Sequence, residues 1–172
     1  MNIEFYNKLL PNEGTYCVAV LPVGEGQRMR HIFVDSIEEL VGRVEEAKHD
    51  NHVFVGMANF DGHSRKKAKT LKSFFVDLDV GDTKDYSSQA EAVNALGKFI
   101  QSQELPPPVV VDSGNGIHAY WMLDVEVSAE EWKLYADKLK QLCIKNGLKI
   151  DPAVTADKAR ILRCPSTFNF KS

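Results

Sequence analysis

The chain has 172 residues, of which 44% are hydrophobic and 26% charged, and 21 basic against 24 acidic residues give it a net charge of −3. This composition is that of a globular protein and excludes a disordered, collagen-like or small disulfide-stapled chain. No apolar run approaches the roughly 18 residues of a membrane helix, and the N-terminus lacks the basic and apolar regions of a secretory signal. A mildly acidic chain is also not a nonspecific nucleic-acid coat, although it is compatible with a local basic patch.

The first half of the chain predicts strands, one helix and a basic loop. Ser36 and Glu39 form a capping box, in which the hydroxyl and the carboxylate each satisfy a free backbone N–H at the start of a helix. The segments expected here are strands at 15–21, 30–34 and 52–58, a helix at 36–49, and a polar loop at 60–72. The loop carries five basic residues: Arg65, Lys66, Lys67, Lys69 and Lys72.

The second half repeats the strand and helix signals. Capping boxes begin at Ser88 and Ser128, Gly147 is placed to end the second helix, and Asn115-Gly116 is a strong hairpin signal. The segments expected here are strands at 73–80, 109–112 and 117–123, helices at 88–103 and 128–146, and an ambiguous stretch at 153–163. The pattern predicts one α+β domain with mixed or antiparallel sheets. The three cysteines lack zinc-site spacing and are expected to be reduced thiols.

Two carboxylates interrupt an apolar strand. Asp77 and Asp79 stand at positions i and i+2 of SFFVDLDV, so strand alternation places both on one face of the sheet. Like charges on a partly buried face repel each other and lose hydration, and a cation between them relieves both penalties. Oxygen ligands suit Mg²⁺ or Mn²⁺. The alternative is an exposed strand end at which the two carboxylates have no role.

A glycine-containing turn with a histidine follows. In the sequence SGNGIHAYW, the glycines allow backbone N–H groups to approach an anion, and His118 can donate to a phosphate oxygen. His118 and Tyr120 share one strand face, and Ile117, Ala119 and Trp121 share the other. An ordinary hairpin with a structural histidine is the alternative.

The C-terminal stretch combines one carboxylate with three basic residues. Asp151 follows an apolar residue, and Arg160, Arg163 and Lys171 follow within the next twenty positions. Arginine forks match phosphate geometry bidentately. A solvated basic face is the alternative, and Asp151-Pro can simply begin a turn.

Taken in order, these features resemble the motifs of the archaeo-eukaryotic primase superfamily, in particular the primase-polymerases of phage and plasmid replication proteins. Members carry a hydrophobic strand with D-x-D, then S-x-H in a glycine-containing turn, then a hydrophobic residue followed by Asp. Here these are Asp77 and Asp79, Ser113 to His118, and Ile150-Asp151. Many members continue with R-x-P-G-T-x-N-x-K, and residues 163–171 read RCPSTFNFK, with Ser166 in place of Gly. The resemblance spans about residues 50–172.

The resemblance implies a fold and a set of site residues. The fold is α+β, with an RRM-like catalytic sheet facing a smaller α/β N-terminal part and the active site between them. Asp77, Asp79 and Asp151 would be catalytic and would hold two divalent ions, Mg²⁺ or Mn²⁺. The residues that would bind the incoming nucleotide are Ser113, Gly114, Asn115, Gly116, His118, Arg160, Arg163 and Lys171. Lys66, Lys67 and Lys69 would face the triphosphate or the template backbone, or belong to a solvated loop.

The activity implied is template-dependent nucleotidyl transfer by a DNA primase and DNA polymerase. Its partners would be a single-stranded DNA template and dNTPs or NTPs, during replication of a phage or plasmid. We expect residues 1–172 to form one catalytic domain, an N-terminal fragment of a longer replication protein in which a helicase domain can follow. We expect a monomer in the cytoplasm of a bacterial or archaeal cell, with no membrane partner.

Two other functions remain open. A HAD-type phosphohydrolase also has a hydrophobic D-x-D strand, but Gly81 stands where that family usually has Thr or Val, and no later D-D pair follows. A non-catalytic single-stranded DNA or origin-binding module on an RRM-like sheet is the second. Its open face normally displays aromatics, whereas carboxylates would repel phosphate without a metal. Tyr120, Trp121 and Phe168 are candidates for base stacking, although the pattern favours a core position for each.

Overall fold

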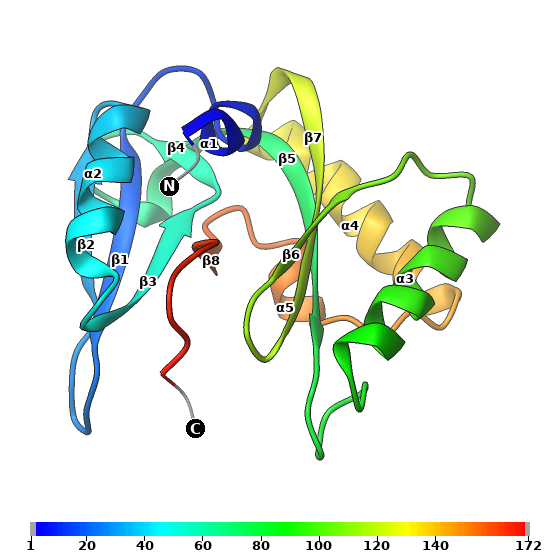
Figure 1. The fold of residues 1–172 in the computed structure, drawn as a ribbon. Helices are drawn as coiled ribbons and strands as arrows, with labels where there is room; N and C mark the ends of the chain where they lie inside the picture. The colour runs from blue at the N-terminus through cyan, green and yellow to red at the C-terminus, as the bar shows by residue number, and fades with distance from the viewer. Residues whose placement is uncertain (1–2, 171–172) are drawn as a thin grey trace.

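Two four-stranded antiparallel sheets face each other in the computed structural model, which describes residues 3–170 (Figure 1). The first sheet has the order β2-β1-β3-β8, with β1 Tyr16–Pro22, β2 Arg30–Val34, β3 Asn51–Gly56 and β8 Ile161–Arg163. The second sheet has the order β4-β5-β7-β6, with β4 Ala58–Phe60, β5 Ala68–Asp79, β6 Val109–Asp112 and β7 Gly116–Ser128. The N-terminal part is therefore completed by β8, from near the other end of the chain.

The helices lie mainly outside the two sheets. They are α1 Ile3–Leu9, α2 Ile37–Ala47, α3 Gln89–Ser102, α4 Ala129–Lys145 and α5 Pro152–Thr155, with a 3₁₀ turn η1 at Arg65–Lys67. Helices α3 and α4 lie on the side of the second sheet away from the first, and α2 lies beside β1 and β2 (Figure 1). The segment after β8, drawn in red, runs between the two sheets (Figure 1).

Polar side chains fix the helix ends as the sequence predicts. The hydroxyls of Ser36, Ser88 and Ser128 accept hydrogen bonds of 3.1–3.2 Å from the backbone N–H three residues later. Helix α4 ends at Gly147, whose φ of +74° lets the Leu148 N–H reach the Cys143 carbonyl at 3.0 Å. The three predicted helix starts and the C-terminal glycine cap are thus confirmed.

The pairing of β5 with β7 places the predicted site residues on one face. Asp77 is directly opposite His118, and Phe75 is opposite Tyr120. The alternate positions, such as Val76 and Ala119, are buried in the apolar cluster that includes residues of α3 and α4. The face that carries Phe75 and Tyr120 belongs instead to the core shared with the first sheet and α1. One strand face therefore passes from apolar core to the polar Asp77–His118 pair.

Some segments differ from the sequence prediction. The strand predicted at 52–58 is confirmed as β3 but ends earlier, because the chain leaves the first sheet after Gly56 and enters the second at β4. The loop predicted at 60–72 is confirmed only between β4 and β5, because β5 already begins at Ala68, where it pairs with β4 despite its lysines. Phe168, expected in the core, is 56% exposed, whereas Tyr120 and Trp121 are buried as expected.

No helix among residues 3–170 is both long enough and apolar enough to cross a membrane. Cys17, Cys143 and Cys164 are free and buried, as expected for reduced thiols.

Candidate active site

A cavity of about 320 Å³ is lined from both sheets, and half of the predicted site residues line it. Its lining consists of Phe54, Asp77, Asp79, Lys84, Ser113, Asn115, His118, Arg160, Ile161, Leu162, Arg163 and Asn169. The second sheet supplies the carboxylates and His118, whereas β8 and the loop before it supply the two arginines. The D-x-D strand, the turn, the histidine and the arginines, distant in sequence, are thus brought together around one space.

Asp77 is the least hydrated carboxylate of the cavity. Its side chain is only 17% exposed, and His118 Nε2 lies 3.7 Å from its Oδ1. The pKa of Asp77 is raised to about 7, mainly by burial and also by the Asp79 and Asp151 carboxylates, with Arg160 and Lys84 opposing the shift. The ionised form of Asp77 is therefore unfavourable unless a positive charge is added nearby.

His118 is held as a neutral donor. Burial, followed by the charges of Arg163 and Arg160, lowers the pKa of His118 to about 4. Its Nδ1 lies 3.1 Å from the hydroxyl of the buried Tyr120. We assign the hydroxyl as the donor, because Nε2 then carries the proton and faces the Asp77 carboxylate. The arrangement directs one N–H from β7 into the cavity.

Asp79 has a cationic partner at the other end of the D-x-D pair. Lys84 Nζ lies 2.9 Å from Asp79 Oδ2, and this contact raises the pKa of Lys84. Lys84 follows the turn at Gly81, whose φ is +155°. The ammonium group of Lys84 therefore occupies a position next to Asp79 at which the sequence predicts a metal cation.

Asp151 lies beside Asp77 through the backbone. Its N–H donates to the Asp77 carbonyl at 2.9 Å, and its carboxylate caps α5 by accepting the Ala153 N–H at 2.8 Å. Asp151 does not line the cavity, although it is close enough to raise the pKa of Asp77. Within residues 3–170, no group of three or more His, Cys, Asp or Glu side chains is arranged to hold a metal ion. The predicted three-carboxylate metal site stays a prediction.

The Ser113–Gly116 turn forms one wall of the cavity through Ser113 and Asn115. The Gly114 N–H donates to Asp112 Oδ1 at 2.7 Å, so this amide is used within the turn. A Cβ on Gly114, whose φ is +92°, would lie 2.8 Å from Asn169 Cβ. The absence of a side chain at Gly114 thus allows the C-terminal segment to pack against the turn.

The glycine at position 116 has a different role. A Cβ there would lie 2.3 Å from the Leu78 carbonyl oxygen of β5. Gly116 therefore allows the close approach of β7 to the strand end that carries Asp79, its partner in the pairing. Its contribution to the site is to the geometry of the hairpin.

The two arginines are held in different ways. The guanidinium of Arg163 lies over the Phe54 ring at 4.8 Å and donates to the Phe168 carbonyl at 3.1 Å. Arg160 is positioned through its backbone, because its N–H donates to the Asp157 carbonyl and its carbonyl accepts from Met57. The Nε of Arg160 is buried and has no hydrogen-bond partner within the described residues. Within the described residues, the guanidinium of Arg163 is therefore held by its neighbours, whereas Arg160 is fixed mainly through its backbone.

The predicted basic residues of the loop lie elsewhere. Lys66, Lys67 and Lys69 are not among the described residues that line the cavity, and Lys67 lies 3.8 Å from Asp61. Lys66 lines a second cavity, described below. Lys171 lies outside the described residues.

Five lining residues were not predicted from the sequence: Phe54, Lys84, Ile161, Leu162 and Asn169. The basic residue just after the D-x-D strand was a signal for Lys84, and the N of the C-terminal motif was a signal for Asn169. Nothing in the local sequence marked Phe54, because β3 reaches the site only through its pairing with β8.

Comparison with solved structures identifies the fold. The chain is similar to the AEP domain of the primase-polymerase of cyanophage S-2L, with a TM-score of 0.62, 16% identity, and coverage of 87% of this chain and 72% of that one. It is also similar to the catalytic domain of primase RepB′ in complex with initiator DNA, with a TM-score of 0.56, 16% identity, and coverage of 94% and 72%. The polymerase domain of Mycobacterium tuberculosis ligase D in complex with DNA gives a TM-score of 0.52, 18% identity, and coverage of 90% and 59%.

No protein-family model matches the sequence, and no match to a curated protein was found. The similarity therefore lies in the fold, which is of the archaeo-eukaryotic primase type, as the sequence motifs predict. At the level of fold, the neighbours are primase and polymerase domains.

Proposed function

We propose that this chain is the catalytic domain of a DNA primase-polymerase, a template-dependent nucleotidyltransferase that joins dNTPs or NTPs during replication of a phage or plasmid. The observation that carries this proposal is one cavity in which Asp77 and Asp79 face His118, Arg160 and Arg163. A triphosphate with its metal ions needs acidic ligands and basic phosphate clamps in the same space.

The donor set suits Mg²⁺ or Mn²⁺. Magnesium is usually held by one or two carboxylates together with substrate phosphates, and Asp77 and Asp79 supply two carboxylates on one face. The raised pKa of Asp77 supports a site that favours added positive charge, and Lys84 would have to release Asp79 for that carboxylate to bind a metal ion. Asp151 is the third candidate ligand. Two bound ions would lower the pKa of the attacking 3′-hydroxyl and stabilise the leaving pyrophosphate.

The other residues would bind and orient the nucleotide. The Nε2–H of His118 donates to a phosphate oxygen without adding a charge, since His118 is neutral at the pH of the cell. Arg160 and Arg163 neutralise the triphosphate, and Ser113 and Asn115 border the same space. Lys171 is proposed to assist them.

The assay uses a single-stranded template, with and without an annealed primer, labelled dNTPs or NTPs, and Mg²⁺ or Mn²⁺. We expect metal-dependent extension of the primer that is lost in Asp77→Asn/Asp79→Asn, with weak or no synthesis in the unprimed reaction. Priming holds two nucleotides at once and in related proteins often uses an accessory domain. Absence of both extension and metal-dependent nucleotide binding would refute the proposal.

Two alternatives predict different results. A non-catalytic DNA-binding module would bind single-stranded DNA equally with and without divalent ions and would tolerate Asp77→Ala. A HAD-type phosphohydrolase would release phosphate from a generic ester in a reaction that Asp77→Asn abolishes. The cationic residues around the D-x-D pair and the primase-type fold favour nucleotidyl transfer over both.

A further inference from the structure

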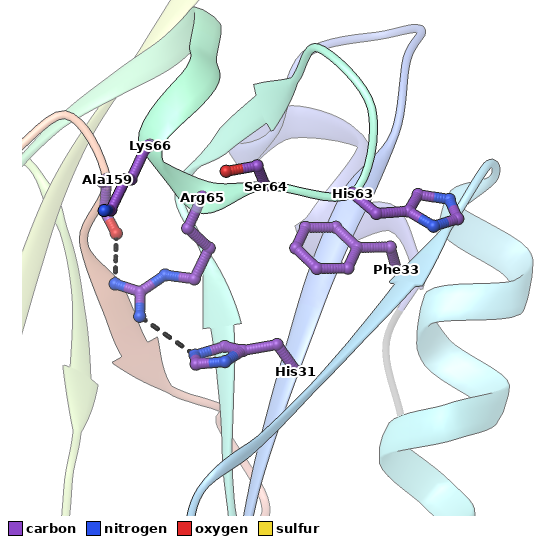
Figure 2. A pocket seen from close by; sticks show the side chains of 7 residues that line it. All are labelled: His31, Phe33, His63, Ser64, Arg65, Lys66 and Ala159. Atoms are coloured by element: carbon purple, nitrogen blue, oxygen red, sulfur yellow. Dashed lines mark hydrogen bonds between the residues drawn. The ribbon is translucent and has the colours of Figure 1, made fainter.

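A second and larger cavity, of about 610 Å³, is shown in Figure 2. Ala159 lines this second cavity, and the next residue, Arg160, lines the first. The rest of its lining comes from β2 and from the segment between β4 and β5. Only a short stretch of backbone therefore separates the two cavities.

We propose that this second cavity binds one nucleotide unit of a single-stranded nucleic acid, with its phosphate against Arg65 and Lys66 and its base against the Phe33–His63 ring pair. The proposal rests on the proposed function for its choice of partner. The nucleic-acid contact lies outside the carboxylate site, since the two cavities have different lining residues.

The positive charge of this cavity is not neutralised by the protein. Arg65 donates to His31 Nε2 at 3.0 Å and to the Ala159 carbonyl at 2.6 Å (Figure 2), and both acceptors are uncharged groups. Because arginine only donates, His31 accepts through Nε2 and is neutral; burial and the Arg65 charge also lower the pKa of His31. Neither Arg65 nor Lys66 forms an ion pair with a carboxylate in the described part of the chain.

The charge of Arg65 also suits a phosphate. Its Nε is buried and has no hydrogen-bond partner among the described residues, so this N–H is not open to the cavity. The guanidinium still carries a full positive charge, and phosphate is the anion that best matches it. The cavity therefore favours an anion.

A flat aromatic surface favours a nucleotide over a simple anion. The rings of Phe33 and His63 are nearly parallel, with 5.4 Å between centroids and 8° between planes. Figure 2 shows the two rings next to each other at the cavity. His63 is exposed, so the outer ring of this pair is open to a further planar group. Nucleobases stack on such surfaces regardless of sequence. Unpaired bases are required for this contact, so the partner is single-stranded.

The test is fluorescence anisotropy with a labelled oligothymidylate of about twelve nucleotides, in EDTA at about pH 8, where histidine is neutral. We expect Lys66→Ala to weaken binding about three- to tenfold and to reduce the slope of log K against log salt by about 0.7, because one phosphate contact is lost. His63→Ala should weaken binding about fivefold or more without changing the slope. Lys98→Ala, which removes the same charge from the exposed side of α3, should change neither.

The outcomes separate this inference from the proposed function. Equal effects of Lys66→Ala and Lys98→Ala, or no binding by the wild type at low salt, would overturn the inference. Competition by inorganic phosphate together with no effect of His63→Ala would identify a plain anion site and also overturn it. Binding that depends on Lys66 and His63 in a protein that never extends a primer would uphold the inference and refute only the proposed function.

Discussion

Asp77 and His118 lie directly opposite each other on β5 and β7, with His118 Nε2 3.7 Å from Asp77 Oδ1. His118 is buried and Asp77 is only 17% exposed, and their pKa values move in opposite senses, that of Asp77 up to about 7 and that of His118 down to about 4. Burial is the main cause of both shifts and favours the uncharged form of each group. Without an added cation, the site thus holds a neutral Asp77 beside a neutral His118 between about pH 4 and pH 7.

The first prediction concerns the pH dependence of stability. Because the pKa of Asp77 is higher in the folded than in the unfolded chain, its contribution to the free energy of unfolding falls as the pH rises from about 4 to about 7. Asp77→Asn removes this loss, so the variant should gain on the order of 2–4 kcal/mol over the wild type between about pH 4 and pH 8. Urea unfolding in EDTA measures the difference.

The effect of His118 on stability runs the other way and is present in both proteins. Its lowered pKa makes folding less stable as the pH falls from about 6.5 to about 4. Added Mn²⁺ should stabilise the wild type more at pH 8 than at pH 5, and the variant at neither. A stability difference that stays constant with pH would contradict the placement of Asp77.

The second prediction concerns Tyr120. Tyr120→Phe leaves the buried Nδ1 of His118 without its donor, so the free energy of unfolding should fall by about 1–2 kcal/mol. The KM for the nucleotide should rise more than kcat falls, because the direction of the Nε2–H is no longer fixed. Tyr86→Phe is the matched control, since it removes a tyrosine hydroxyl that accepts the Lys149 N–H away from the cavity. Equal KM values in the two variants would show that Tyr120 is only structural.

The third prediction separates the two arginines. Arg160→Met should leave the free energy of unfolding within about 0.5 kcal/mol of the wild type while raising the Kd for the triphosphate about tenfold or more. Arg163→Met should lower the free energy of unfolding and also raise the Kd for the triphosphate, because it removes the contacts with Phe54 and the Phe168 carbonyl as well as a charge. Chemical denaturation and a nucleotide titration of each variant measure the two effects. The account fails here if Arg160→Met destabilises the fold and spares nucleotide binding.

The fourth prediction concerns the hairpin. Gly116→Ala places a methyl group 2.3 Å from the Leu78 carbonyl oxygen, so β7 must move away from β5. We expect a loss of about 1–3 kcal/mol of stability and lower activity, because the shift occurs beside Asp79. Gly97→Ala on α3 is the control, since its Cβ meets nothing within 4 Å and alanine favours a helix. Equal thermal stability of the two variants would contradict the close approach.

Local signals predicted the elements that local interactions fix. The serine caps, the Gly147 cap and the alternation around Asp77 act within a few residues, so the sequence displays them. The long β5 was predicted too short because its basic first part is ordered by pairing with β4 and β7. Strand β8 has three residues and exists only through its pairing with β3.

In the candidate site, too, the sequence predicted the features that depend on local pattern. Asp77 and His118 follow from strand alternation, and the turn from its glycines. The contributions of Phe54 and Lys84, and the separate cavity at Lys66, depend on how the two sheets meet. That arrangement is a tertiary property, which no short window of sequence encodes.

The most direct measurement is single-nucleotide addition to a primer opposite each of the four template bases, with Mg²⁺ or Mn²⁺ and with the Asp77→Asn/Asp79→Asn variant in parallel. The account predicts that the wild type adds the complementary nucleotide in a metal-dependent reaction and that the variant adds none. Addition that ignores the template base, addition that persists in the variant, or no addition with either metal would contradict it.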